Sequence, residues 1–426
     1  MGFPSLQADA VLLMWVQLLV IVAAGRLLGA AFRRIGQPGV VGELLAGVLL
    51  GPSVLGWLWP AAAAIVVPDD RLAAAPLNAI AWLGVALLLV LTGLETDLAT
   101  IRRLGRASAL IAAGALGLPF AAGIGIGLLM PASFHGDAAT RIAFVLFIAI
   151  ALSISSLPVI ARILTELGLV RHDTGQMIIA VAMTNDLAGW AALGLVTALA
   201  QAGTLSFGTV ATLLGGVALL LAAALTAGQR LVDAALRAVR ERGTEYGGLV
   251  VAVVATGALA ALAHLAGSDV VIGAYLAGLL LSRSRFFPAQ LRQQLEPLTV
   301  TILAPVFFAT AGLRLDLTAL ADAQALLWAG VVLVCAVATK VAGALGGALL
   351  ARVGLRDGLT IAVGLNARGA VEVVIATVGL QTGILSATAY TAIVLMAIVT
   401  TVMAPPLLQA LRPARARTTA TAEVPV

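Results

Sequence analysis

Long apolar segments recur along the whole chain, separated by short stretches that carry arginine, proline or acidic residues. Most of these segments reach the length of about 20 residues that a helix needs to cross the hydrocarbon core of a bilayer. Because lipid offers no partners for backbone N–H and C=O groups, such segments are helical. The pattern predicts an all-α polytopic membrane protein with about thirteen transmembrane helices, at residues 10–32, 38–56, 78–95, 106–130, 140–167, 174–201, 206–228, 246–265, 270–283, 299–313, 323–351, 356–380 and 387–411.

The arginines between these segments predict the orientation of the chain. Alternate loops, beginning with the one after the first segment, hold 19 basic residues, whereas the opposite set holds only Arg71, Arg141 and Arg314. Basic residues accumulate in the cytoplasmic loops of membrane proteins. We therefore expect the N-terminus outside and the C-terminus in the cytoplasm, with residues 1–411 as a single membrane domain and residues 412–426 as a disordered cytoplasmic tail.

The composition agrees with this class of protein. Hydrophobic residues make up 61% of the chain and charged residues 11%, and the mean hydropathy is +1.09, which excludes a soluble globular domain. The basic residues lie in short clusters between apolar segments, so we expect a lipid bilayer and no nucleic acid as partner. One such cluster, residues 229–245, is a basic amphipathic stretch expected on the cytoplasmic surface. The alanine- and arginine-rich, lysine-poor composition suggests a high-GC genome, and we expect the inner membrane of a bacterium.

Polar residues interrupt two of the predicted helices. Ser155, Ser156 and Pro158 break the fifth segment in "ALSISSLPVIARIL", and Asn366 and Arg368 break the twelfth in "AVGLNARGAVEVV", about 210 residues later. The neighbouring segments correspond as well, which predicts two inverted-topology repeats, about 10–201 and 246–411, joined by a linker helix at about 206–228. Paired broken helices in inverted repeats indicate a binding site near the membrane midplane. The alternative is that both breaks are simple kinks.

Asp186 and Lys340 are ionisable residues placed near the middle of apolar segments. Charges at this depth mark ion pathways or pair with one another. Lys340 is the only lysine, and lysine can lose its charge when it is desolvated, whereas arginine cannot. A proton and a small alkali cation would compete for the Asp186 carboxylate, with candidate cation ligands on Asp186, Asn185, Thr184, Ser155 and Ser156. The alternative is a structural salt bridge between Asp186 and Lys340.

Other charged residues inside the segments are expected to have supporting roles. Arg368 and Glu372 are four residues apart and could pair along one helix, or Glu372 could meet Arg162 across the broken-helix crossing. We interpret Arg162, Pro158, Asn366, Arg368 and Glu372 mainly as stabilisers of that crossing. Glu43 either lines a funnel towards the site or caps a neighbouring polar group.

The ordered set of motifs resembles the monovalent cation/proton antiporter-2 family, the Kef-like and plant CHX-like exchangers, in its membrane domain. The matching motifs are "GQPGVVGELLAGVLLGPSVLG", "LLLVLTGLETDL", "ALSISSLPVIARILTELGL", "LAPVFFATAGLRLDL" and "GLNARGAVEVVIATVGLQTGIL". The resemblance implies an antiporter fold, in which a core domain of segments 4–6 and 11–13 moves against a dimerisation domain of segments 1–3 and 8–10.

The same resemblance implies roles for single residues. Asp186 matches the essential aspartate that binds cation and proton, and Lys340 matches a lysine that can pair with that region. Asn185 stands where electrogenic sodium antiporters of this fold have aspartate, which favours electroneutral exchange of Na⁺ or K⁺ for H⁺. The resemblance also implies a homodimer, with no cofactor beyond the transported ions.

Three other functions are less consistent with these residues. A sodium-coupled solute symporter would need a larger polar cavity than the Ala-, Val-, Leu- and Gly-rich core segments offer. A passive cation channel stays an alternative that a saturating and obligatorily proton-coupled flux would exclude. An intramembrane protease would need a second aspartate or a serine–histidine pair at this depth, so we expect no enzymatic activity.

Overall fold

A computed structural model describes residues 8–68, 71–96, 98–138, 140–170, 172–202, 215–216, 218–266 and 270–411, and its regular elements there are helices. The α-helices are α1 (Ala8–Arg34), α2 (Gly39–Leu50), α3 (Leu55–Leu58), α4 (Pro60–Val66), α5 (Arg71–Glu95), α6 (Leu98–Leu129), α7 (Arg141–Ser153), α8 (Leu157–Glu166), α9 (Asp173–Ala202), α11 (Gln229–Arg242), α12 (Gly247–Leu265), α13 (Val270–Arg283), α14 (Ala289–Leu298), α15 (Ala304–Leu313), α16 (Ala323–Leu350), α17 (Leu355–Leu365), α18 (Ala370–Gln381) and α19 (Ala387–Leu411).

The helices coincide with the apolar segments that the sequence indicated. In the described part of the chain, eleven helices are long and apolar enough to cross a membrane, and the bent pair α17–α18 makes a twelfth. The shorter apolar helix α13 lies where the ninth segment was expected. The all-helical class is therefore confirmed, while the number of membrane crossings stays a prediction. Arg171, the first part of the linker segment and the tail 412–426 lie outside the described residues.

Several helices extend beyond their predicted ends, two of them through π-helical stretches. The segment expected at 299–313 belongs to a continuous helix, Gln290–Leu313, that includes a π-helical stretch at Thr299–Leu303, two residues after Pro297. The linker likewise continues through a π-helical stretch at Ala224–Gly228 into α11, so the basic amphipathic stretch is a helical extension of the linker and not a separate surface segment. In both cases the helix continues into a stretch of polar residues. A prediction based on hydropathy alone ends the segment where charged residues begin.

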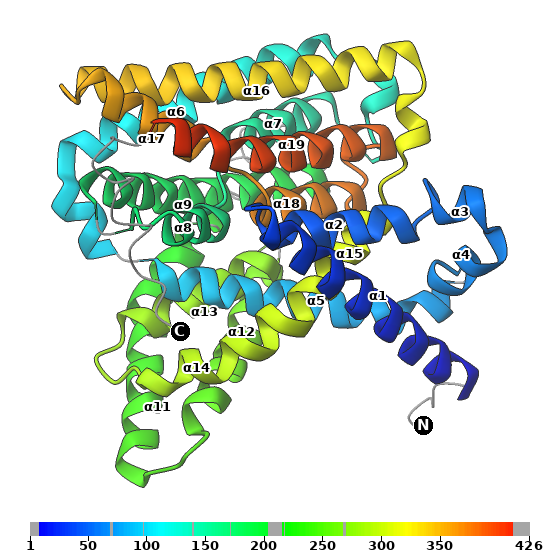
Figure 1. The fold of residues 1–426 in the computed structure, drawn as a ribbon. Coiled ribbons are helices and arrows are strands. Elements are labelled where there is room, and N and C mark those ends of the chain that lie inside the picture. The colour runs from blue at the N-terminus through cyan, green and yellow to red at the C-terminus, as the bar shows by residue number, and fades with distance from the viewer. Residues whose placement is uncertain are drawn as a thin grey trace, which may run out of the picture.

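The helices form two bundles (Figure 1). The first bundle, α6–α9 with α16–α19, occupies the upper half of Figure 1, and the second bundle, α1–α5 with α11–α15, occupies the lower half. Few contacts join them, chiefly between α15 and α18, α9 and α13, and α2 and α19. This grouping matches the division into core and dimerisation segments that the family resemblance implied.

Small residues let α16 pack closely on α6. Gly343 and Gly347 face the α6 backbone at Gly114 and Leu110, where a Cβ atom on either glycine would collide with a backbone oxygen. Lys340 is buried on the same stripe of α16, one turn before Gly343. Close glycine contacts of this kind hold helices together where no hydrophobic effect acts between them. The stripe thereby carries the Lys340 side chain into the first bundle.

Candidate functional site

The helix break between α7 and α8 contains the serines and proline that the sequence singled out. α7 ends at Ser153, and the backbone is extended at Ile154 (ψ 151°) and Ser156 (ψ 100°) before α8 begins. Pro158 lies in the first turn of α8, where its missing N–H leaves no helical hydrogen bond unmade. The break is therefore a change of backbone conformation and more than a kink.

The second break separates α17 from α18, whose axes differ by 42°. Asn366 caps the end of α17, and Gly369 precedes α18 with a φ of 143°, a region that favours glycine. The Gly369 N–H donates to Glu372 Oε2 at 2.9 Å. Glu372 thus places its carboxylate at the positive N-terminus of α18.

The two breaks meet through direct hydrogen bonds. Ser155 Oγ donates to the Leu365 carbonyl at 2.7 Å, across 210 positions of sequence. The Ser156 N–H donates to the Ala367 carbonyl at 3.2 Å. The predicted crossing of the two broken helices is thus present in the structure.

Two cationic side chains satisfy the last carbonyls of α7. Arg368 donates to the Ala151 and Leu152 carbonyls at 2.8 and 2.5 Å, and Lys340 Nζ donates to the Ser153 carbonyl. Both side chains are fully buried. Helix C-termini carry unpaired carbonyls and a partial negative charge, so cationic donors stabilise this end of α7.

This arrangement differs from the ion pairs considered from the sequence. Lys340 binds a backbone carbonyl and has no ion pair with Asp186 within 4.0 Å in the part of the chain that the structure describes. Arg368 and Glu372 likewise bind backbone groups in place of each other. Backbone carbonyls at the helix break bind the Lys340 and Arg368 side chains in place of the carboxylates. The spacing of residues in the sequence could not reveal this.

Asp186 lies near the middle of α9 with no accessible surface. Neither carboxylate oxygen has a hydrogen-bond partner among the described residues. The groups that act on it electrostatically include the Leu157 N–H at the start of α8, the Lys340 ammonium and the Glu372 carboxylate. A buried carboxylate without a partner is costly and calls for a proton or a bound cation.

Further oxygens without a partner come from the residues predicted to bind a cation. In the described chain, Ser156 Oγ and Asn185 Oδ1 are buried and make no hydrogen bond, and Asn366 Oδ1 is in the same state. Asn185 Nδ2 contacts Ser155 Oγ at 3.4 Å, which joins α9 to the α7–α8 break. Thr184 is only partly buried and donates to the Ala180 carbonyl of its own helix at 2.9 Å. Thr184 is therefore turned back on α9 more than the other candidates.

A cavity of about 800 Å³ lies between the two bundles beside this site. Its walls come from α2, α5 and α14–α15 of the second bundle and from α8, α9 and α18 of the first. Arg292 and Glu296, whose side chains are about half exposed, stand at one end, and Leu157, Met183 and Ala370 line the part next to the crossing. Met183 is one turn before Asp186 on α9. The cavity therefore reaches within one helical turn of the buried carboxylate.

Glu43 lines this cavity from α2 and is 7% exposed. Arg26 and Arg33 of α1 and Arg162 of α8 act on it electrostatically. Of the two roles considered for Glu43, the funnel position is the one that the geometry supports. Arg162 of α8 lines the same cavity, and its role at the broken-helix crossing stays a prediction.

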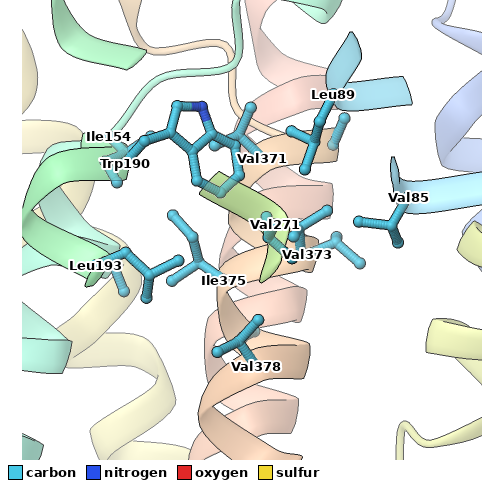
Figure 2. Packing of buried hydrophobic residues seen from close by; sticks show 14 of the residues in the cluster. Val85, Leu89, Ile154, Trp190, Leu193, Val271, Val371, Val373, Ile375 and Val378 are labelled. Atoms are coloured by element: carbon cyan, nitrogen blue, oxygen red, sulfur yellow. The ribbon is translucent and has the colours of Figure 1, made fainter. Parts of the chain in front are cut away.

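On the other side of Asp186 an apolar layer closes the space between the bundles (Figure 2). Figure 2 shows Trp190 and Leu193 of α9 and Ile375 of α18 facing Val271 of α13, with Leu89 of α5 nearby. Trp190 also packs against Tyr275 of α13, with ring centroids 6.1 Å apart. The site is therefore open towards a cavity on one side and sealed by hydrophobic packing on the other.

Tyr275 and Trp190 are site neighbours that the sequence did not reveal. Tyr275 shares a hydrogen bond with Thr96 Oγ1 at 3.0 Å, and Trp190 follows Asp186 by four residues on the same face of α9. The spacing to Asp186 was the available signal for Trp190. Tyr275 gave none, because an aromatic residue in an apolar segment is ordinary.

Comparison with known proteins places the chain among ion exchangers. The family model described as "Sodium/hydrogen exchanger, transmembrane" matches residues 19–411. The chain is 33% identical over 405 residues to Cation/H(+) antiporter 19 of Arabidopsis thaliana, covering 94% of this chain but only 50% of that protein. It is 31% identical to the Na(+)/H(+) antiporter NhaS4 of Synechocystis, covering 96% of this chain and 100% of that protein.

The fold also matches a solved structure. The sodium proton antiporter MjNhaP1 from Methanocaldococcus jannaschii aligns over 97% of this chain and 100% of its own, with a TM-score of 0.67 and 14% sequence identity. The predicted antiporter fold and the family resemblance are both confirmed by these matches. The chain spans about half the length of the plant relative.

Proposed function

Since the chain belongs to the sodium/hydrogen exchanger family, we propose that it is a secondary antiporter that exchanges a monovalent cation, Na⁺ or K⁺, for H⁺ across a membrane. The observation that carries this proposal is the Asp186 carboxylate, fully buried at the crossing of two broken helices and without a hydrogen bond from the described residues. Such a group has to bind either a proton or a cation, and one excludes the other. Competition for one carboxylate couples the two ions.

The proposed cation ligands are the oxygens that surround Asp186. Ser156 Oγ and Asn185 Oδ1 have no partner in the described structure and can coordinate a hard cation together with Asp186. Ser155 Oγ, which donates to Leu365, and Thr184 Oγ1, which donates to Ala180, each keep lone pairs for the ion. Carbonyls freed by the breaks complete a shell of the oxygen type that alkali cations prefer.

We further propose that the exchange is electroneutral. The site offers one acidic side chain on α9, because residue 185 is asparagine. Lys340 and Arg368 are engaged with α7 carbonyls, so the charge that changes during exchange is that of Asp186. One proton leaves as one cation enters, and no net charge crosses the membrane.

The arrangement of the two bundles supports a proposal for alternating access. The cavity opens on the side that carries Arg162 and Arg292, which the positive-inside rule assigns to the cytoplasm. The apolar layer of Figure 2 closes the other side. We propose that the first bundle slides against the second as an elevator, so that the cavity closes and the apolar layer parts.

The remaining features of the proposal concern the whole protein. We propose a homodimer in the inner membrane of a bacterium, with the N-terminus outside and the C-terminus in the cytoplasm. We propose no enzymatic activity and no resident cofactor, the transported ions being substrates.

The test is proton movement in liposomes that contain purified protein and a pH-sensitive dye. Addition of Na⁺ or K⁺ should release or take up protons with wild-type protein and should identify the ion. Asp186→Asn, which keeps the shape of the side chain but cannot ionise, should reduce cation-dependent proton flux to the level of empty liposomes. Asp316→Asn is the matched control, since Asp316 is a partly exposed carboxylate outside the site and asparagine can still accept the hydrogen bond from the Thr318 N–H, so the flux should be unchanged.

Gel filtration and thermal unfolding should be used to test whether Asp186→Asn is folded. Equal flux in wild type and in folded Asp186→Asn would contradict the proposed exchange site. Cation flux without proton movement in wild type would contradict antiport itself and favour a channel or a sodium-coupled symporter.

A further inference from the structure

A second cavity lies far from Asp186, at the end of the second bundle where α11 turns into α12. It has a volume of about 580 Å³. Its walls are apolar on two sides, formed by Leu236 and Val239 of α11 and by Phe286, Phe287 and Pro288 in the loop before α14. None of these residues takes part in the exchange site.

The polar side of this pocket combines one arginine, one glutamate and neutral polar groups. Arg240 lines it, and Arg237, one turn earlier on the same face of α11, lies with its guanidinium 5.3 Å from the centroid of the Phe286 ring. Thr244, Gln290 and Gln294 add neutral polar groups, and Glu245 is the one acidic residue among the lining. Part of the basic stretch seen in the sequence, Arg240 and the neighbouring Arg237, thus lies at one wall of the pocket.

The backbone holds these walls in place. α11 ends at Gly243, whose φ of 62° allows the left-handed turn that closes the helix. At the start of α12, a Cβ atom on Gly248 would come within 2.9 Å of Pro288 Cγ, so α12 packs directly against the loop that carries the phenylalanines. The pocket therefore lies between elements that contact each other.

We propose that this pocket binds the headgroup of an anionic phospholipid. Guanidinium groups recognise phosphate oxygens through planar, paired donors, and Arg240 and Arg237 lie beside apolar walls that would accept the glycerol backbone and upper acyl chains. The pocket lies between the end of α11 and the start of α12, and the orientation proposed above puts these helix ends at the cytoplasmic surface of the membrane. Basic pockets between helices at that surface suit anionic headgroups.

An occupied pocket would also act on the transport cavity through α14. Gln290 and Gln294 line the pocket, whereas Arg292 and Glu296 of the same helix line the cavity beside Asp186. Arg292 is held by Glu95 of α5 at 2.9 Å and by Glu296 at 3.0 Å. A bound lipid that fixes α14 would therefore steady one wall of the cavity.

The experiment measures lipid binding by the purified full chain in detergent, by native mass spectrometry and by thermal stability. The probes are phosphatidylglycerol, phosphatidylcholine with the same acyl chains, and inorganic phosphate. Wild type should bind phosphatidylglycerol in preference to phosphatidylcholine and be stabilised by it. Each arginine near an anionic lipid contributes about fivefold, so Arg237→Gln with Arg240→Gln should weaken phosphatidylglycerol binding about thirtyfold.

Two further variants make the result specific. Arg230→Gln with Arg242→Gln removes the same charge from α11 outside the pocket lining and should bind phosphatidylglycerol like wild type. Arg237→Lys with Arg240→Lys keeps the charge but loses the paired donors, so it should bind phosphatidylglycerol more tightly than the double glutamine variant and more weakly than wild type.

Equal loss in the pocket variant and in the Arg230 and Arg242 control would overturn the site, because the effect would then be one of general charge. Equal binding of phosphatidylcholine, or the same stabilisation by inorganic phosphate, would overturn the assignment to an anionic lipid. These measurements do not depend on transport, so failure of the lipid-binding proposal and failure of the proposed exchange can be told apart.

Discussion

At the scale of single residues, the charges around the helix crossing have different tasks. Lys340 and Arg368 complete the hydrogen bonding of the α7 C-terminus, and Glu372 does the same for the α18 N-terminus. Asp186 alone is left without a hydrogen bond from the described residues. The cations and Glu372 are thus mainly engaged in structure, which leaves Asp186 as the carboxylate of the proposed exchange.

Lys340→Met should therefore destabilise the protein. The substitution keeps the apolar stem but removes the donor to the buried Ser153 carbonyl, and an unsatisfied buried group costs about 1 to 3 kcal/mol. Thermal unfolding in detergent should show a lower melting temperature for Lys340→Met and a nearly normal one for Lys340→Arg, which keeps the charge and the donors. An unchanged melting temperature together with an altered pH profile of exchange would instead assign Lys340 to Asp186.

Asn185→Asp should alter the stoichiometry of exchange. The variant places a second carboxylate beside Asp186, at a side chain that contacts Ser155 and has no accessible surface. If this carboxylate also binds and releases a proton, each cycle moves net charge. Exchange by the variant should then respond to an imposed membrane potential, whereas wild type and Asn185→Ser should not. A wild-type rate that depends on the potential would contradict electroneutral exchange.

The sequence was enough to find Asp186 but could not show what its neighbours bind. A carboxylate in an apolar run stands out because its burial is expensive. The partners of Lys340, Arg368 and Ser155 are backbone carbonyls of Ser153, Ala151, Leu152 and Leu365. Every residue has a carbonyl, so nothing in the sequence marks those that a helix break sets free.

At the scale of elements, the two broken helices depend on backbone conformations that ordinary helices lack. Gly369 has a φ of 143°, and a Cβ atom there would approach Val159 Cγ2 to 2.9 Å. The glycine therefore permits both the turn into α18 and its contact with α8. This pairing of a special backbone angle with a close neighbour holds the crossing together.

Gly369→Ala should consequently reduce both stability and transport. The strained backbone should cost about 1 to 3 kcal/mol, and the added methyl group pushes α8 away from the break. Thermal unfolding and proton flux measure the two effects. Gly330→Ala is the control, because a Cβ atom at that helical position of α16 meets no neighbouring atom within 4 Å. A fully active and stable Gly369→Ala would mean that the break tolerates an ordinary side chain.

Helix positions were largely predictable from the sequence, whereas helix continuity was not. The apolar limits of α9, α12, α13 and α19 lie close to their predicted ends because charged or glycine residues bound them. The helix from Gln290 to Leu313 was underestimated because Arg292 and Glu296 lower the hydropathy of its first turns. Arg292 and Glu296 line the cavity, so polar residues that belong to the cavity lower the hydropathy that is used to find the helix.

At the scale of the whole molecule, the structure is open on one side of Asp186 and closed on the other. The sequence could suggest two groups of helices through its family resemblance, but it could not say which side is open, because the proposed alternating access requires one sequence to support both states. The closed side is held by the apolar layer and by one buried contact between bundles, in which Tyr390 Oη of α19 donates to the Ala311 carbonyl of α15 at 2.8 Å. Figure 2 shows how the apolar layer fills the space between α9, α18 and α13.

Tyr390→Phe should shift the balance between the two states without removing any proposed ligand. A buried hydrogen bond contributes about 1 kcal/mol, so its loss should raise the population opened on the outer side about fivefold.

Val378, a buried member of the apolar layer near the end of α18, can report this opening as Val378→Cys in a Cys335→Ala background. A membrane-impermeant thiol reagent added outside should then react about five times faster in Tyr390→Phe than with Tyr390 intact. Tyr246→Phe, an exposed position at the start of α12, should leave the rate unchanged. Equal rates in all three proteins would mean that the Tyr390 contact persists in both states. The bundles would then not separate along α19 and α15, and the sliding surface of the proposed elevator would have to lie elsewhere.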